Sequence, residues 1–134
     1  MTAKIEIRET TPDEIPALEG LYRATFPEED LVALVRDLVH AGPDVLSLAA
    51  VADGAIVGHV AFTRCAIGES GTRAALLAPL AVAPDRQRRG LGRALVNAGF
   101  DRLAEEGLLN VFVLGDPADY SRLGVTREDA VLPP

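Results

Sequence analysis

The chain has 134 residues, of which 49% are hydrophobic and 25% are charged, the balance of one folded domain over residues 1–134. Its net charge of −7 argues against a nucleic-acid partner, and one cysteine with two histidines argues against a metal site. No stretch reaches the roughly 18 uncharged apolar residues of a membrane span, and the polar N-terminus predicts no signal peptide, so we expect a cytoplasmic protein without a membrane partner.

The first third of the chain predicts a strand followed by two helices. Residues 4–9 alternate between polar and apolar side chains, which indicates a half-buried strand. Thr11, Pro12 and Glu14 then form a helix-start signal, and apolar side chains recur at helical spacing as far as Phe26. Pro27 and the three acidic residues after it predict the start of a second helix, because acidic side chains favour the positive end of a helix.

The middle of the chain predicts three strands. Residues 46–52 and 55–67 flank Asp53-Gly54, the pattern of a tight hairpin. The third strand, residues 73–82, contains Pro79, which has no N–H to donate and therefore predicts a bulge or a splayed edge. A helix ending near Glu106, a buried strand at 109–114 and a short helix at 117–123 follow. This order predicts an α+β fold with a mixed, mostly antiparallel central sheet flanked by helices.

The basic residues gather in one loop. Residues 1–44 hold ten acidic and four basic residues, whereas four of the thirteen basic residues lie between Arg86 and Arg93. Gly90 and Gly92 stand among them at the start of a predicted helix, where free amides and close backbone approach favour an anion. The loop therefore predicts an anionic small ligand, a diphosphate rather than a single carboxylate, with a solvated basic turn as the alternative.

Two familiar phosphate loops are excluded by the residues that follow the glycines. A Walker A loop needs Lys-Ser/Thr after its last glycine, and Gly92 is followed by Arg93-Ala94. A dinucleotide fingerprint needs a third small residue, and that position holds Leu95.

The loop resembles that of a known family. Gln87-Arg88-Arg89-Gly90-Leu91-Gly92 is similar to the Q/R-x-x-G-x-G/A acetyl-CoA loop of the GNAT superfamily of N-acyltransferases, and Leu80-Ala81-Val82-x-Pro84 is similar to the strand before it. The stretch from Asp116 to Val125, with Tyr120-Ser121-Arg122-Leu123-Gly124 inside it, resembles a later helix motif of the family. Leu77-Ala78-Pro79-Leu80-Ala81-Val82, taken with Val113-Leu114-Gly115-Asp116-Pro117, resembles a bacterial subgroup of predicted acetyltransferases.

The resemblance implies acetyl-CoA as co-substrate. The loop amides would bind its pyrophosphate, Gln87 would stiffen the loop or meet the cofactor, and the strand backbone would pair with the pantetheine arm. One strand amide, near Leu80 or Ala81, would polarise the thioester carbonyl. The implied cofactor-binding residues are Leu80, Ala81, Val82, Gln87, Arg88, Arg89, Gly90, Leu91, Gly92 and Arg93. Tyr120 matches the catalytic tyrosine that protonates the departing thiolate, or else packs the short helix on the sheet.

The acceptor and the general base are less defined. Glu28 and Glu29, beside Asp30, lie between the first two helices, where the family's acceptor enters, and would favour a cationic amine. Their alternative role is to stabilise a helix N-terminus. His59 lies within a strand and is either a substrate-site residue that titrates near neutral pH or a buried structural histidine.

The chain departs from the family after residue 125. Only nine residues follow, where the family continues with one or two strands, so we expect terminal strands to be missing or shortened. The sheet edge would then be covered by a second copy of the chain, giving a homodimer, or would stay open.

Two functions of different classes follow from the sequence. The first is an N-acetyltransferase that moves the acetyl group of acetyl-CoA directly to a primary amine of a small molecule or peptide. The alternative is a non-catalytic acyl-CoA-binding module or sensor with the same fold.

Overall fold

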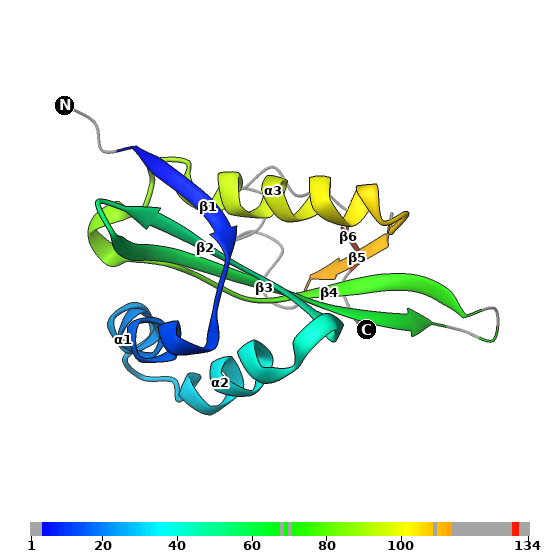
Figure 1. Cartoon of the computed structure of the whole chain (residues 1–134), viewed down its shortest axis with the longest axis horizontal. Coiled ribbons are helices and arrows are strands. Elements are labelled where there is room, and N and C mark those ends of the chain that lie inside the picture. The colour runs from blue at the N-terminus through cyan, green and yellow to red at the C-terminus, as the bar shows by residue number, and fades with distance from the viewer. Residues whose placement is uncertain (1–3, 68, 70, 109, 114–129, 132–134) are drawn as a thin grey trace.

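The computed structural model describes residues 4–67, 69, 71–108, 110–113 and 130–131. The elements follow one another in the order β1 (Ile5–Glu9), α1 (Ile15–Thr25), α2 (Val32–His40), β2 (Val45–Ala52), β3 (Ala55–Ile67), β4 (Thr72–Val82), α3 (Leu91–Glu105), β5 (Asn110–Val113) and β6 (Ala130–Val131) (Figure 1). Short 3-10 turns at Pro12–Glu14, Gly42–Asp44 and Pro84–Arg86 connect some of them.

One sheet organises the molecule, with its strands in the order β1-β2-β3-β4-β5-β6. The first four strands are antiparallel, whereas β5 runs parallel to β4 and β6 runs parallel to β5. Helix α3 covers one face of the sheet, and α1 and α2 cover the other (Figure 1). The predicted mixed, mostly antiparallel sheet flanked by helices is confirmed.

Each face of the sheet has its own hydrophobic core. Under α3 the core contains Phe62, Leu77 and Leu95, none of which is exposed to solvent. Under α1 and α2 a smaller cluster includes Leu18 and Tyr22. The two faces are therefore separate apolar layers, and a residue's place along a strand decides which layer it joins.

The predicted turn signals form as expected. Asp53 and Gly54 have positive φ angles of 51° and 80° and join β2 to β3 in a two-residue hairpin. At the first helix, Thr11 and Glu14 make a reciprocal capping box. Arg8 binds the Glu14 carboxylate at 2.9 and 2.6 Å, and this contact lowers the pKa of Glu14 to about 2.

The expected bulge at Pro79 is confirmed. Leu77 pairs with Phe62 and Leu80 pairs with Val60, so Ala78 and Pro79 stand opposite a single residue of β3. Strand β5 pairs only with residues 74–77 of β4. Within the described part of the chain, the last residues of β4 therefore have a paired strand on one side only.

One expectation about an element's start needs correction. Helix α2 begins at Val32 rather than at Pro27, so the acidic residues lie in the turn before the helix. At the far edge of the sheet, strand β6 has only two residues and pairs with Val111 and Phe112 of β5, which agrees with the expected shortening of the terminal strands. The expected homodimer through this edge stays a prediction. The short helix expected at 117–123 lies outside the described residues. None of the described helices is long and apolar enough to span a membrane.

Candidate functional site

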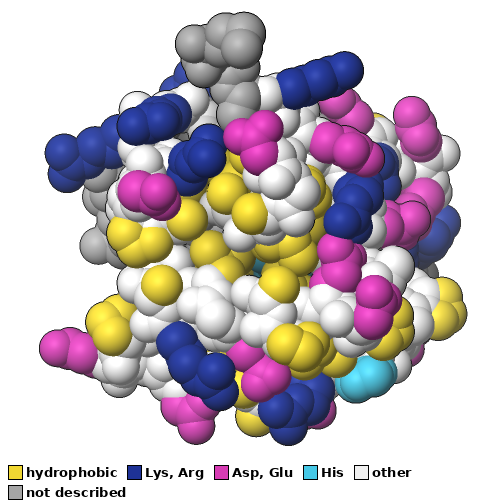
Figure 2. All heavy atoms as spheres, turned by 60° about the vertical axis from the view of Figure 1, so that its left-hand side comes forward, with side chains coloured by type: hydrophobic (Ala, Val, Ile, Leu, Met, Phe, Trp, Pro, Cys, Tyr) yellow, Lys and Arg dark blue, Asp and Glu magenta, His cyan; other side chains and the backbone are white. Residues whose placement is uncertain are grey.

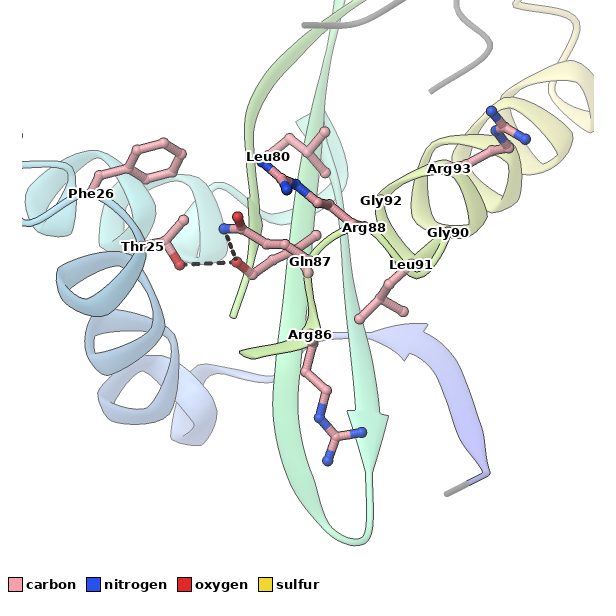
Figure 3. A pocket seen from close by; sticks show the side chains of 11 residues that line it. Thr25, Phe26, Leu80, Arg86, Gln87, Arg88, Gly90, Leu91, Gly92 and Arg93 are labelled. Atoms are coloured by element: carbon pink, nitrogen blue, oxygen red, sulfur yellow. Dashed lines mark hydrogen bonds between the residues drawn. The ribbon is translucent and has the colours of Figure 1, made fainter. Parts of the chain in front are cut away.

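A cavity of about 670 Å³ lies where the end of α1, the unpaired edge of β4 and the start of α3 meet (Figure 3). Figure 2 views this end of the molecule and shows hydrophobic side chains toward the middle with acidic and basic side chains around them. The lining residues are Thr25, Phe26, Leu80, Val82, Arg86, Gln87, Arg88, Gly90, Leu91, Gly92 and Arg93. Of the ten cofactor-binding residues expected from the sequence, all but Ala81 and Arg89 line this cavity.

The start of α3 supplies backbone donors to the cavity. Gly90 caps the helix in the left-handed conformation, with φ of 82°, and accepts the first helical hydrogen bond from Ala94 at 3.0 Å. The N–H groups of Leu91 and Gly92 therefore precede the first helical bond and have no acceptor within the helix. Together with the helix dipole they form a site for an anion.

Arginines add positive charge to this anion site. Arg88 is exposed and has a φ angle of 65°, and its side chain extends over the cavity in Figure 3. Arg86 and Arg93 extend to either side of it. Within the described residues, no ion pair joins Arg86, Arg88 or Arg89 to an acidic group. Their charge is therefore available to a bound phosphate.

The backbone of β4 alternates between β3 and the cavity. Ala83 donates to the carbonyl oxygen of Val57 at 2.9 Å, which fixes the phase of the ladder. Because hydrogen-bonded pairs alternate in an antiparallel ladder, the backbone groups of Ala81 face β3, and those of Leu80 and Val82 face the unpaired edge. Ala81 is also buried against α1. The strand groups that face the cavity are thus those of Leu80 and Val82.

The carbonyl oxygen of Val82 has two side-chain partners. The Gln87 amide donates to it at 3.0 Å and the Thr25 hydroxyl at 3.3 Å (Figure 3). Gln87 thus braces the loop against β4, as one of its two expected roles requires. Thr25 ties α1 to the same atom.

His59 is buried in the described structure, and both of its ring nitrogens have hydrogen-bond partners. Its ring is fully buried, with Nδ1 2.7 Å from the Tyr22 hydroxyl and Nε2 2.8 Å from the Ser47 hydroxyl. Burial lowers the pKa of His59 to about 4, so the ring is neutral at pH 7. Of the two roles left open by the sequence, the burial and the two partners agree with the structural one.

The acidic residues lie beside the cavity rather than in it. Glu28 and Glu29 are exposed and line a second hollow of about 610 Å³, together with Arg23 and Arg36. Pro27, which lines this hollow, is the next residue in the chain after Phe26, which lines the first cavity. The expected catalytic residue, Tyr120, lies outside the described residues.

The sequence and the fold match known acetyltransferases. The sequence model of the Acetyltransferase (GNAT) family matches residues 15–122. The chain belongs to the GNAT family. It is 39% identical over 119 residues to YhbS of Escherichia coli K12, described as an uncharacterized N-acetyltransferase, covering 88% of this chain and 71% of that protein.

Solved acetyltransferase structures superpose on the chain, and the first two described here contain CoA or acetyl-CoA. The crystal structure of E. coli YhbS in complex with CoA has a TM-score of 0.82 and 37% identity, covering 92% of this chain and 69% of the other. A GNAT acetyltransferase of Brucella melitensis in complex with acetyl-CoA has a TM-score of 0.81 and 29% identity, covering 93% and 84%. An aminoglycoside acetyltransferase from an uncultured soil metagenomic sample has a TM-score of 0.69 and 26% identity, covering 92% of each chain.

This GNAT chain is an acetyl-CoA-dependent N-acetyltransferase. Acetyl-CoA is its co-substrate. The cavity suits that molecule because the amides at the start of α3 and the cationic side chains of Arg86 and Arg88 line it together with Leu80 and Val82 of β4. Sequence reasoning missed three lining residues: Thr25, Phe26 and Arg86. Arg86 could have been included with the other loop arginines, but no local pattern places the end of α1 against β4.

Proposed function

We propose that acetyl-CoA binds in the cavity between α1, β4 and α3, and that the single domain 1–134 transfers its acetyl group directly to a cationic primary amine of a small molecule or peptide. The cavity carries this proposal, because it joins a positively charged helix N-terminus to unpaired strand backbone. The pyrophosphate would lie on the amides of Leu91 and Gly92 with arginines around it. The pantetheine arm would follow the edge of β4.

The transfer needs an oxyanion donor, a base and an acid. The cationic amine first loses one proton to solvent or to a relayed water, which frees the lone pair on its nitrogen. The nitrogen then attacks the thioester carbonyl, an N–C bond forms and the C–S bond breaks. The second proton lost from the nitrogen replaces the one that the acid gives to the departing thiolate. We assign the oxyanion donor to the N–H of Leu80, because the N–H of Ala81 faces β3. Tyr120 would give its proton to the departing thiolate. His59 is not the base, since burial holds its pKa near 4 and removes it from the cavity.

The acidic turn before α2 supports a cationic acceptor. Glu28, Glu29 and Asp30 follow Pro27, the residue after cavity residue Phe26. Arg23 and Arg36, in the same hollow, pair with Glu19. The soil relative is named for aminoglycosides, which are polycationic amines, and this agrees with the sign of the charge here. We expect replacement of Glu28 and Glu29 by glutamine to raise KM for a polyamine acceptor about three- to tenfold and to leave KM for acetyl-CoA unchanged. An equal change in both constants would contradict this assignment.

Thermal unfolding with and without acetyl-CoA tests the cofactor site, with equal ATP as the comparison ligand. A ligand at about 100 times its dissociation constant adds roughly 2.7 kcal/mol to the free energy of unfolding. Stabilisation by acetyl-CoA and not by ATP is the expected result. Stabilisation by ATP instead would point to a nucleotide-binding protein.

A pair of glycine variants locates the binding site. Gly90→Glu places a carboxylate among the loop amides and should abolish coenzyme A binding. Gly54→Glu is a matched control, because Gly54 has nearly the same φ angle, 80° against 82°, and likewise has open space around a new Cβ. Both variants place a glutamate at a similar positive φ angle, so only the first should lose the ligand. Binding retained in Gly90→Glu would remove the loop from the site.

Product formation separates the enzyme from a non-catalytic acyl-CoA-binding module. Release of the coenzyme A thiol is followed with a thiol reagent over a panel of primary amines. Cys65 is exposed and reacts with the same reagent, so a reaction without amine serves as the blank. Amine-dependent release supports transfer, whereas binding without release from any amine favours the module.

A further inference from the structure

The carbonyl oxygen of Val82 is the point at which all three walls of the cavity meet. Gln87 reaches it from the loop before α3, and Thr25 reaches it from the last residue of α1 (Figure 3). A carbonyl oxygen has two lone pairs, so these two donors fill its accepting capacity. These two hydrogen bonds to Val82 form the Val82 junction.

The end of α1 is held to the sheet at two polar points one turn apart. Thr25 makes one at the Val82 junction, and the Tyr22 hydroxyl makes the other with His59 at 2.7 Å. Phe26, the next residue, stacks on Tyr22 with ring centroids 6.2 Å apart, and its N–H donates to the Tyr22 carbonyl at 2.8 Å. Since Phe26 lines the cavity, the position of this wall depends on how α1 is fixed to β4.

We propose that Thr25 is a positioning residue for acetyl-CoA. Its hydroxyl holds the end of α1 at the edge of β4, so the groove keeps the width that the pantetheine arm requires. Because the Val82 carbonyl is already filled, an amide N–H of that arm pairs with the carbonyl of Leu80, the next strand group that faces the groove. This inference rests on the placing of acetyl-CoA in the cavity under the proposed function.

An alternative role for Thr25 predicts tighter rather than weaker coenzyme A binding when its hydroxyl is removed. If Thr25 merely occupied an acceptor that the cofactor needs, removal of its hydroxyl would free the Val82 carbonyl and tighten binding. If Thr25 positions the wall, removal loosens the groove and weakens binding. The oxygen–oxygen distance of 3.3 Å is long for a hydroxyl hydrogen bond, so the expected effect is modest.

Calorimetric binding to a set of variants tests the proposal. Thr25→Val keeps the shape of the side chain and removes the hydroxyl, Thr25→Ser keeps the hydroxyl, and Thr25→Ala serves if the valine variant does not fold. The ligands are coenzyme A and adenosine 3′,5′-bisphosphate, which has the phosphates but no pantetheine arm. We expect Thr25→Val to weaken coenzyme A about three- to tenfold, to leave the nucleotide within twofold, and to be restored by Thr25→Ser.

A control separates positioning from general loss of stability. Arg64→Ala breaks the contacts of Arg64 with Glu106, at 2.7 and 2.6 Å, near the other end of α3 from the cavity. It should lower the free energy of unfolding and leave coenzyme A affinity unchanged.

The outcomes separate this proposal from the proposed function. Unchanged or tighter coenzyme A binding in Thr25→Val, or equal weakening of both ligands, overturns the role of Thr25. If Gly90→Glu still abolishes binding in that case, the cofactor site itself stands. A wild-type protein that binds no coenzyme A overturns both.

Discussion

The buried histidine predicts a specific loss of stability in mild acid. His59 is fully buried, and burial lowers its pKa from 6.5 to about 4. As the pH falls below 6.5, the unfolded chain takes up a proton on this ring, whereas the folded chain stays neutral until about pH 4. The free energy of unfolding therefore decreases across this window, by about 2 kcal/mol between pH 7 and pH 5. For a domain with roughly 5–15 kcal/mol in total, this is a large part.

Among the described carboxyl groups, those with a lowered pKa, Glu14 and Glu106, contribute little in the same range. Arg8 lowers the pKa of Glu14 from 4.5 to about 2, so the stability that Glu14 adds is lost only as the pH falls below 4.5. The interval from pH 7 to pH 5 thus isolates the histidine.

Urea unfolding at pH 7, 6 and 5 measures this loss of stability. The slope of the free energy of unfolding against urea concentration should stay constant, which checks two-state behaviour. His59→Asn is the comparison, because it keeps a polar side chain and cannot titrate, while His40 is present in both proteins. Only the change with pH is compared, so a lower overall stability of the variant does not matter. Equal pH dependence in the two proteins would refute the reasoning. If the variant does not fold, a ring pKa above 6 measured by NMR in the wild-type protein would refute it instead.

Three further substitutions should lower stability, raise stability and lower turnover, respectively. Gly99→Ala should lower the free energy of unfolding by about 1–3 kcal/mol, because a Cβ there would lie 2.1 Å from the ring of Phe62. Gly20→Ala should raise it by about 0.5–1 kcal/mol, since Gly20 lies within α1 with no atom within 4 Å of a new Cβ; denaturant midpoints check both, and a shift of the same sign would contradict the packing. Tyr120→Phe should keep coenzyme A affinity and lower kcat roughly a hundredfold, and an unchanged kcat across a pH series would remove Tyr120 from the mechanism.

The elements that could be predicted are those with local signals. Asp53-Gly54 fixed the hairpin because two adjacent positive φ angles need such residues, and the capping pair Thr11 and Glu14 marked the first helix. The start of α2 was predicted too early because acidic residues suit both a helix N-terminus and the turn before one. Strand β6 carries no signal of its own, since two residues are too few to show alternation.

The residues of the candidate site also differ in whether a local sequence signal could predict them. The loop arginines and glycines could be read from one stretch of twelve residues, because a phosphate site at a helix start is local in sequence. Thr25 lies 57 positions before Val82, and only the packing of α1 on the sheet brings the two together. The role of His59 was equally undecided by sequence, because its partners Tyr22 and Ser47 are 37 and 12 positions away.

The bulge at Pro79 explains why this cavity lies where it does. Before the bulge, Leu77 belongs to the core under α3, whereas after it Ala81 belongs to the core under α1 and α2. The extra residue therefore exchanges the faces of the strand, since a shift of one position moves every side chain to the opposite side. The same shift turns the side chains of Leu80 and Val82 toward the α3 layer, in register with Val60 and Gly58. One proline-containing bulge thus turns the side chains at the end of β4 toward α3, whose N-terminus lines the cavity. Strand β5 pairs only with the residues of β4 before the bulge. Without the extra residue, Leu80 and Val82 would face α1 and α2, and no groove of this form could open beside the loop.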